Sequence, residues 1–223
     1  MKINKNLIIV FVKEPKLGFV KTRLAHNTSN VFVLDLYQKF VKDIIHTLKD
    51  SGYDFKLCAY PKLEIVNNTF GDFDNFLQED GDLGVKMQKA FESQFNLGYD
   101  KIILIGSDTP HISQDILEDT FNNLKNNDIV LGPSLDGGYY LIAFNKQTFY
   151  PDTFQNIEWS TEKVLQQTQQ RLHTKRIYLL KELNDIDIIG DLEAFYQDFH
   201  NSYFKNSNTI QFLKKDLSWR DLT

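Results

Sequence analysis

Short apolar runs recur along the chain, spaced so that a helix fits between most of them. Residues 7–12, 55–60 and 101–106 are almost entirely apolar, and many of them are β-branched. Continuous runs of this kind are typical of central strands in a parallel sheet, because both faces of such a strand are covered. Weaker patterns predict the remaining strands, at residues 128–131, 139–144 and 176–180 and briefly around Phe76.

Between these runs, apolar residues recur every three or four positions. They do so from Asn30 to Gly52, and glycine is a typical residue at the end of a helix. Ser113 has a side chain suited to cap the start of another helix. The same spacing predicts helices at residues 63–70, 83–95, 114–124, 161–172 and 191–199.

Alternating strands and helices predict an α/β fold with three αβα layers around a mostly parallel central sheet. No repeat, linker or low-complexity segment divides the chain, so we expect one domain over residues 1–223. Its tail, residues 201–223, carries enough large apolar side chains to pack on the rest. Ligands of such sheets bind outside the carboxyl ends of the strands, which here means after Val12, Gly106 and Leu131.

The composition is that of a globular protein. The chain has 223 residues, of which 42% are hydrophobic and 25% charged, with a formal net charge of −5. These proportions exclude general disorder, and the acidic balance argues against a nucleic-acid surface. No apolar run approaches the roughly 20 residues that cross a bilayer, and no signal-peptide pattern is present. We therefore expect a soluble cytoplasmic protein with no nucleic-acid partner and no membrane span.

Cysteine and histidine offer little chemistry. Cys58 is the single cysteine and lies inside an apolar run, which predicts a buried, unreactive thiol. The five histidines show no zinc-ligand spacing.

A basic loop follows the first predicted strand. It reads Lys-Glu-Pro-Lys-Leu-Gly-Phe-Val-Lys-Thr-Arg over residues 13–23. Lysine, arginine and threonine side chains there could bind phosphate, and Gly18 would let the backbone approach it closely. The alternative is a solvated basic turn. The loop is neither a P-loop nor a dinucleotide-binding loop, because the required glycines are missing.

The strand that ends at Gly106 is followed by Ser107, Asp108, Thr109 and a proline. A carboxylate at a strand end can bind Mg²⁺, which takes one or two protein carboxylates and completes its shell with phosphate oxygens and water. The alternative is an Asx turn that caps the next helix.

Two further segments could reach a ligand. Residues 132–138 read Gly-Pro-Ser-Leu-Asp-Gly-Gly, and Gly137 and Gly138 would allow close backbone approach; a hairpin turn is the alternative. Asp136 stands where a serine-hydrolase elbow needs glycine. The segment Trp159, Ser160 and Thr161 could form a lid, or Ser160 could cap a helix.

Acidic pairs occur at 72/74, 80/82 and 185/187, and this spacing alone is a weak signal. The last pair follows a predicted strand and precedes a helix, which favours it for a second metal position. We expect Asp187 to bind metal beside Asp108. Asp185, two residues away on an extended chain, should point to the opposite side and be dispensable.

Taken together and in this order, these segments resemble a bacterial family of glycosyltransferase-like proteins, also described as radical-SAM/selenodomain-associated transferases. The resemblance covers residues 7–192. It rests on the Phe-x-Lys-x-Pro-x-x-Gly-x-x-Lys-Thr-Arg-Leu pattern of residues 11–24, Gly-Asp-Leu-Gly at 81–84, Ile-Gly-Ser-Asp-Thr-Pro at 105–110, Leu-Gly-Pro at 131–133, Asp-Gly-Gly-Tyr at 136–139 and Trp-Ser-Thr at 159–161. It implies the GT-A (nucleotide-diphospho-sugar transferase) fold, shared with molybdopterin and phospholactate nucleotidyltransferases.

The resemblance also implies roles for individual residues. Lys21, Arg23 and Asp108 would be catalytic, and Asp108 and Asp187 would hold Mg²⁺ or Mn²⁺. Asp82 would face the base or ribose. The full set expected to bind substrate is Lys13, Gly18, Lys21, Thr22, Arg23, Asp82, Gly84, Ser107, Thr109, Asp136, Gly137, Gly138, Trp159, Ser160 and Thr161.

Two departures from the family pattern stand out. The nucleotidyltransferase relatives open with a glycine-rich loop, where this chain has Val-Lys-Glu-Pro-Lys at residues 12–16. The pattern Asp-x-Asp-Thr-x-x-Asp-Leu appears at residues 185–192 with Ile188 in place of threonine.

The leading functional prediction is a metal-dependent transferase that uses a nucleotide or nucleotide-sugar donor and a small-molecule acceptor. The alternatives are a nucleotidyltransferase of the phospholactate guanylyltransferase type and a non-catalytic nucleotide-binding protein. A phosphatase-like hydrolase is disfavoured, since no convincing nucleophile or two-metal cluster is evident. The donor, the acceptor and the oligomeric state stay open at this level.

Overall fold

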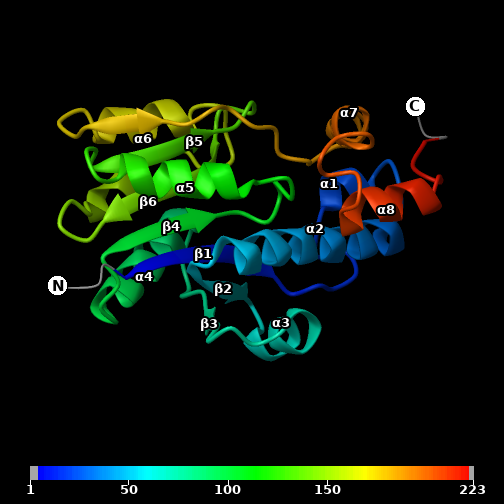
Figure 1. The fold of residues 1–223 in the computed structure, drawn as a ribbon, viewed down its shortest axis with the longest axis horizontal. Coiled ribbons are helices and arrows are strands. Elements are labelled where there is room, and N and C mark those ends of the chain that lie inside the picture. Colours follow the sequence, from blue (N-terminus) through cyan, green and yellow to red (C-terminus); the bar gives the residue numbers. More distant parts are fainter. Residues whose placement is uncertain (1–4, 221–223) are drawn as a thin grey trace.

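A computed structural model describes residues 5–220 and contains a central sheet of seven strands in the order β3-β2-β1-β4-β6-β5-β7. Figure 1 shows the strands side by side, from β5 near the top of the view to β3 near the bottom, with helices packed against them. The strands are β1 (Asn6–Lys13), β2 (Asp54–Tyr60), β3 (Phe76–Leu77), β4 (Lys101–Ile105), β5 (Ile129–Pro133), β6 (Tyr139–Asn145) and β7 (Ile177–Leu179).

The helices lie in both outer layers and around the carboxyl-terminal part of the chain. They are α1 (Thr22–Ala25), α2 (Asn30–Ser51), α3 (Leu63–Phe70), α4 (Leu83–Asn96), α5 (Gln114–Asn123), α6 (Val164–Arg171), α7 (Ile189–Phe199), α8 (Asn208–Lys215) and the 3₁₀-helix η1 (Pro151–Phe154). Within the described part of the chain, no helix combines the length and the apolar character needed to cross a membrane.

Every strand pair is parallel except those of β6, which runs antiparallel to both β4 and β5. The predicted three-layer α/β fold with a mostly parallel sheet is therefore confirmed. The antiparallel direction of β6 was not part of the prediction. It places the turn between β5 and β6 at the edge where the parallel strands β1 and β4 end.

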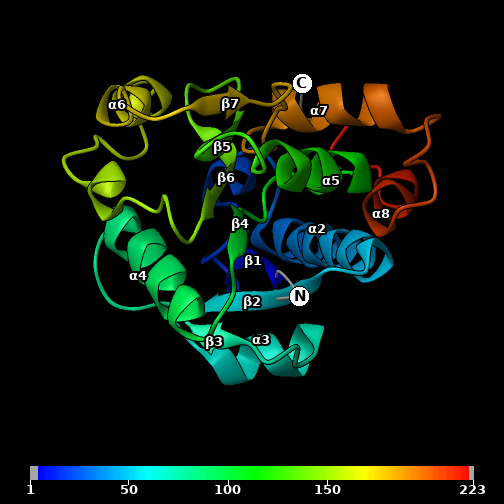
Figure 2. The same cartoon turned by 60° about the vertical axis from the view of Figure 1, so that its left-hand side comes forward.

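Side-chain alternation along β1 produces two cores, one on each face of the sheet. Ile8 and Val10 pack with α2 and α5 on one face. Leu7 and Ile9 pack with α4 on the other face. Figure 2 shows α2 and α5 on one side of the strands and α4 on the other. A strand buried on both sides tolerates few polar residues, which explains why residues 7–12 of β1 form a continuous apolar run.

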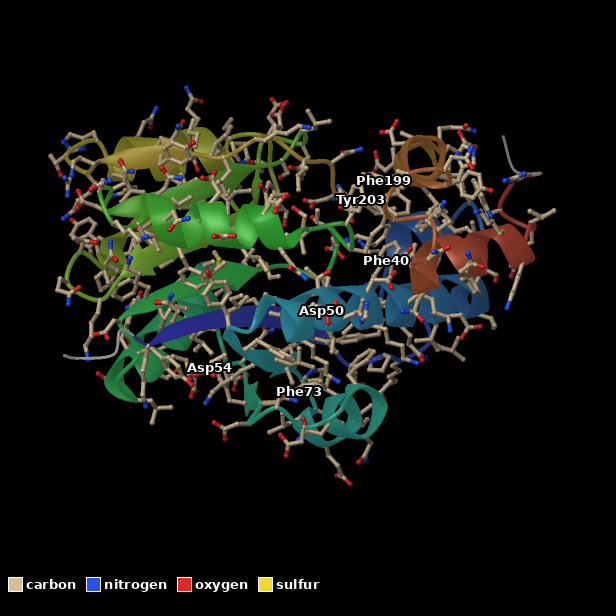
Figure 3. All side chains as sticks on the ribbon, in the orientation of Figure 1. Phe40, Asp50, Asp54, Phe73, Phe199 and Tyr203 are labelled. Atoms are coloured by element: carbon tan, nitrogen blue, oxygen red, sulfur yellow. The ribbon has the colours of Figure 1, made fainter. Side chains whose placement is uncertain are left out.

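A third core, the carboxyl-terminal cluster, joins α7 and α8 to α1 and the first half of α2. It includes Phe40, Phe195 and Trp219, the last of which is only 2% exposed. Phe40 and Phe199, which packs against this cluster, are labelled in Figure 3. Asp43 of α2 accepts hydrogen bonds from the main-chain nitrogens of Asn208 and Thr209 at 2.8 Å each, which fixes the start of α8. Of the predicted tail, residues 221–223 lie outside the described residues.

Local capping explains several helix boundaries. The Ser29 hydroxyl accepts from the nitrogen of Phe32 at the start of α2, and Gly52 ends this helix with φ of +70°. Ser113 caps α5 as predicted. The alternative in which Ser160 caps a helix is wrong, because Ser160 adopts a left-handed conformation with φ of +63° and α6 begins only at Val164.

Candidate active site

A cavity of about 780 Å³ opens at the edge of the sheet where β1, β4 and β5 end and β6 begins. It collects segments that are far apart in the sequence. Twelve residues expected to bind substrate or metal line it: Lys13, Lys21, Thr22, Arg23, Ser107, Asp108, Asp136, Gly138, Trp159, Ser160, Thr161 and Asp187. Five others of that set do not line it: Gly18, Asp82, Gly84, Thr109 and Gly137.

Tyr37 of α2 joins the first two strand ends. Its hydroxyl accepts a hydrogen bond from the nitrogen of Lys13 at 2.8 Å and donates to the carbonyl of Lys13 at 3.2 Å. The hydroxyl of Ser107, which follows β4, lies 3.5 Å from the hydroxyl oxygen of Tyr37. Burial raises the pKa of Tyr37, so the hydroxyl stays protonated and can keep all three contacts. The basic loop and the Asp108 loop are thereby held at a fixed separation.

Lys21 is the cation at the centre of the site. Its ammonium nitrogen lies 2.5 Å from Oδ1 of Asp108 and 3.0 Å from Oδ1 of Asp187, and it donates to the carbonyl of Ile186 at 2.7 Å. The residue has a left-handed backbone conformation, with φ of +47°, just before α1. The side chain is 4% exposed. Burial alone lowers the pKa of Lys21, but the two carboxylates outweigh it and the pKa is raised, so the ammonium stays charged.

The other cations of the basic loop are free of such tight contacts. Arg23 is 69% exposed and its guanidinium lies 3.8 Å from Oδ2 of Asp187. Lys13 lines the cavity and is exposed. Both side chains can turn toward an anion in the cavity, as charge-assisted phosphate contacts require.

The segment before α7 carries both acids of the last pair into the site. The prediction that Asp185 points away is wrong, because it lines the same cavity as Asp187. Side chains two residues apart on an extended chain point to the same side, so the prediction misapplied the alternation, and residues 184–187 form no strand. The Thr109 hydroxyl donates to Oδ1 of Asp185 at 2.5 Å. Burial, opposed by that hydrogen bond and reinforced by Asp108, raises the pKa of Asp185 to about 6.

The glycine segment forms a hairpin turn and also lines the cavity. Oδ1 of Asp136 accepts from the hydroxyl of Ser134 at 2.7 Å and from the nitrogen of Gly138 at 2.9 Å. Gly137 has φ of +86°, and a Cβ there would lie 2.2 Å from the carbonyl oxygen of Glu162. The absence of a side chain at Gly137 therefore lets the 159–162 segment pack against the hairpin.

The residues around the start of α4 have structural roles in this arrangement. Oδ1 of Asp82 accepts from the nitrogen of Val85 at 2.9 Å and caps the helix. A Cβ on Gly84 would lie 2.9 Å from the ring of Trp159, so this glycine allows the helix to approach that ring. A contact between Asp82 and a base or ribose stays a prediction.

Sequence reasoning missed one cation in the cavity. Lys86, on the second turn of α4, places its ammonium nitrogen 3.6 Å from the centre of the Tyr60 ring, and both residues line the cavity. Gln78 lies in the same wall and donates to the carbonyl of Cys58 at 3.0 Å. Lys86 occupies a polar position in an amphipathic helix, so nothing in its local sequence distinguishes it from a solvated lysine.

The arrangement of Asp108 and Asp187 fits a divalent cation. Their Oδ1 atoms converge on one positive centre, the Lys21 ammonium, and their side chains are 45% and 39% exposed. Among residues 5–220, no group of three histidine, cysteine, aspartate or glutamate side chains could hold a metal alone. The donor set therefore suits a hard cation that takes two carboxylates from the protein and its remaining ligands from phosphate and water.

Solved structures similar to this chain are transferases or have the same fold. A protein from Desulfovibrio desulfuricans G20, described provisionally as a nucleotide-diphospho-sugar transferase, is 33% identical, with a TM-score of 0.93 and 99% of each chain covered. A cytidylyltransferase from Leptospira borgpetersenii is 15% identical, with a TM-score of 0.59 and 97% of each chain covered. Rv0371c from Mycobacterium tuberculosis H37Rv, in complex with manganese, is 13% identical, with a TM-score of 0.54 and 87% of this chain and 98% of that chain covered. The last two show the fold alone.

A comparison with curated proteins finds no match. The family described as "Uncharacterized protein conserved in bacteria (DUF2064)" matches residues 44–161, which include Asp108, the β5–β6 hairpin and Trp159. That match covers more than half of the chain, and the Desulfovibrio protein extends the similarity over nearly all of it. The chain belongs to the DUF2064 family and has the nucleotide-diphospho-sugar transferase fold.

Proposed function

We propose that this protein is a metal-dependent transferase whose donor is a nucleotide or a nucleotide sugar. The observation that carries the proposal is the convergence of Asp108 and Asp187 on one cationic centre, beside Lys13 and Arg23, inside a cavity at the ligand edge of the sheet. The similarity to the Desulfovibrio protein supports the same class of reaction.

Each part of the site has a task in such a transfer. Lys13 and Arg23 bind the donor phosphates and orient the bond that breaks, since charge-assisted contacts to phosphate are both strong and directional. Asp108 and Asp187 would hold Mg²⁺ or Mn²⁺, which would supply positive charge for the departing phosphate. Trp159 and the hairpin at Asp136 line the cavity, where they would limit the access of water to the bond that breaks.

Two donors fit this description. With a nucleotide sugar, the acceptor attacks the anomeric carbon and a nucleoside diphosphate leaves. With a nucleoside triphosphate, an acceptor phosphate attacks the α-phosphorus and pyrophosphate leaves. The glycine-rich loop of nucleotidyltransferases is missing after β1, which favours the broader transferase assignment over a phospholactate guanylyltransferase type.

The test is to incubate the protein with Mg²⁺ or Mn²⁺ and a panel of nucleoside triphosphates and nucleotide sugars, and to follow donor consumption by mass spectrometry. Candidate acceptors are supplied as mixtures. We expect one donor class to be consumed, with loss of consumption in Asp108→Asn but not in Asp115→Asn, an exposed residue in the first turn of α5.

Nucleotide binding is measured in parallel by thermal shift. A thermal shift without consumption of any donor would identify a non-catalytic nucleotide-binding protein. The absence of both would contradict the proposal.

A further inference from the structure

The charged residues of the cavity are divided between its two sides. The wall built from the β1 loop and α4 carries all the cations, and the wall built from β4 onward carries all the acids. The cations are Lys13, Lys21, Arg23 and Lys86; the acids are Asp108, Asp136, Glu162, Asp185 and Asp187. The strand order puts β1 and β2 on one side of β4, and β6, β5 and β7 on the other (Figure 1).

The cluster of Lys21, Asp108 and Asp187 lies at the boundary and is largely neutralised within itself. Apart from this cluster, one side of the cavity carries three cations, Lys13, Arg23 and Lys86. The other side carries three acids, Asp136, Glu162 and Asp185. An anionic donor thus has a cationic wall to bind. The remaining space faces carboxylates, and among the described residues that follow β4, up to residue 220, no lysine or arginine lines it.

Carboxylates accept hydrogen bonds and repel anions. Asp136 and Asp185 each use Oδ1 for contacts within the protein, and among residues 5–220 neither Oδ2 has a hydrogen-bond partner. Hydroxyl and amino groups can donate to such oxygens. A phosphate placed there would lie next to several carboxylates, and Lys21, the cation that acts on Asp185, is already paired with Asp108 and Asp187, which disfavours binding of the phosphate. Tyr139 and Trp159 add aromatic surface to the same wall.

We propose that the acidic wall is the acceptor site, and that the acceptor is a non-anionic compound rich in hydroxyl or amino groups. The inference rests on the proposed transferase function and selects between its two chemistries. Nucleotidyl transfer onto a phosphate requires an anionic acceptor, so the wall favours glycosyl transfer from a nucleotide sugar.

In that reaction, an acceptor oxygen or nitrogen forms a bond to the anomeric carbon. The bond from this carbon to the phosphate oxygen breaks, and its electron pair leaves with the nucleoside diphosphate. The proton of the acceptor is released to water.

The test compares matched compounds that differ only by a phosphate: glycerol with glycerol 3-phosphate, glucose with glucose 6-phosphate, and ethanolamine with phosphoethanolamine. Binding to the full-length protein is followed by saturation-transfer NMR, with and without saturating inorganic pyrophosphate. Pyrophosphate fills the cationic wall, so binding that survives it reports on the acidic wall.

We expect the unphosphorylated member of at least one pair to bind in the presence of pyrophosphate, and every phosphorylated member to be displaced by it. Binding of a phosphorylated member that persists under saturating pyrophosphate would overturn the inference. So would the absence of any binding that survives pyrophosphate.

A variant that removes one carboxylate charge tests whether the acidic wall excludes phosphorylated compounds. Asp185→Asn keeps the size of the side chain and its contact with Thr109. Under saturating pyrophosphate, it should raise the saturation-transfer signal of the phosphorylated members to at least three times the background level expected for the natural protein. Glu182→Gln removes a charge from an exposed residue of the same segment that does not line the cavity, and it should change nothing. Equal behaviour of the two variants would contradict the role of the wall.

Failure of the proposed transferase function can be distinguished from failure of the acceptor-site inference. It would appear as no thermal shift with pyrophosphate or nucleotides and no donor consumption. The comparison of matched compounds does not depend on turnover.

Discussion

Replacing Lys21 by methionine tests whether its ammonium occupies the position of the metal. Methionine keeps most of the volume of the buried stem but removes the charge. In the structure, the Lys21 ammonium occupies the point where the Oδ1 atoms of Asp108 and Asp187 converge, so a divalent cation that binds both Oδ1 atoms must displace it. We therefore expect Lys21→Met to bind Mn²⁺ more tightly than the natural protein in the absence of nucleotide.

The size of the effect follows from the two contacts that the metal must replace. Charge-assisted hydrogen bonds contribute about 1.5–3 kcal/mol each when they are shielded from water. The carboxylates are 45% and 39% exposed, so solvent screening reduces each contact to about 0.5–1 kcal/mol. Together they amount to about 1–2 kcal/mol, which corresponds to roughly a 5- to 30-fold gain in Mn²⁺ affinity.

The assay is a titration of free Mn²⁺ followed by electron paramagnetic resonance, with circular dichroism to confirm folding. Lys13→Met is the matched control, since Lys13 lines the cavity and is exposed, and its Mn²⁺ affinity should stay within twofold of the natural protein's. Unchanged or weaker Mn²⁺ binding in Lys21→Met would refute the reasoning, because the ammonium would then not compete with the metal.

Three further outcomes are expected. Asp108→Asn should weaken nucleotide-free Mn²⁺ binding at least tenfold in the same titration, whereas Asp115→Asn on the exposed start of α5 should not. Asp43→Ala removes the acceptor of three hydrogen bonds from the start of α8, so it should lower the free energy of unfolding, measured in urea, by about 2–4 kcal/mol. The control is Asp50→Ala, at an exposed position of α2 that is labelled in Figure 3, and it should lower the free energy of unfolding by less than about 0.5 kcal/mol. Burial lowers the pKa of His111 to about 4, from about 6.5 for a histidine in an unfolded chain. The unfolded chain therefore binds one more proton than the folded protein between these two pH values, and the free energy of unfolding falls by about 3 kcal/mol at most as the pH drops from 6.5 to 4. His111→Phe should remove that part of the pH dependence in urea unfolding at pH 5 and 7; an identical pH dependence in both proteins would contradict the assignment.

The sequence predicted the elements whose own side chains are buried on both faces. The continuous apolar runs of β1 and β4 were enough to predict these strands, because a strand with two covered faces tolerates few polar residues. Helices α2 and α3 were recognisable from apolar spacing, and α2 also from the glycine that ends it. The general position of the site also followed, since the ligand edge is fixed by the direction of the parallel strands.

Features that depend on distant partners were not predictable. The run that becomes β6 reads the same whether the strand is parallel or antiparallel, and only its pairing with β4 and β5 decides. The side chain of Lys21 meets Asp187, 166 positions along the chain, and no local pattern records that contact. The prediction for Asp185 was wrong because it placed residues two apart on opposite sides of an extended chain, whereas such residues share a side, and because residues 184–187 form no strand.

The two tryptophans of the chain report on different parts of the molecule. Trp159 stands in the wall of the cavity, and Trp219 is 2% exposed inside the carboxyl-terminal cluster. Intrinsic fluorescence therefore contains two probes that a collisional quencher such as acrylamide can separate. Occupation of the cavity should protect the quenchable part of the emission, whereas detachment of α7 and α8 should expose the part that was protected. Ligand binding and local unfolding can thus be followed in one unlabelled sample.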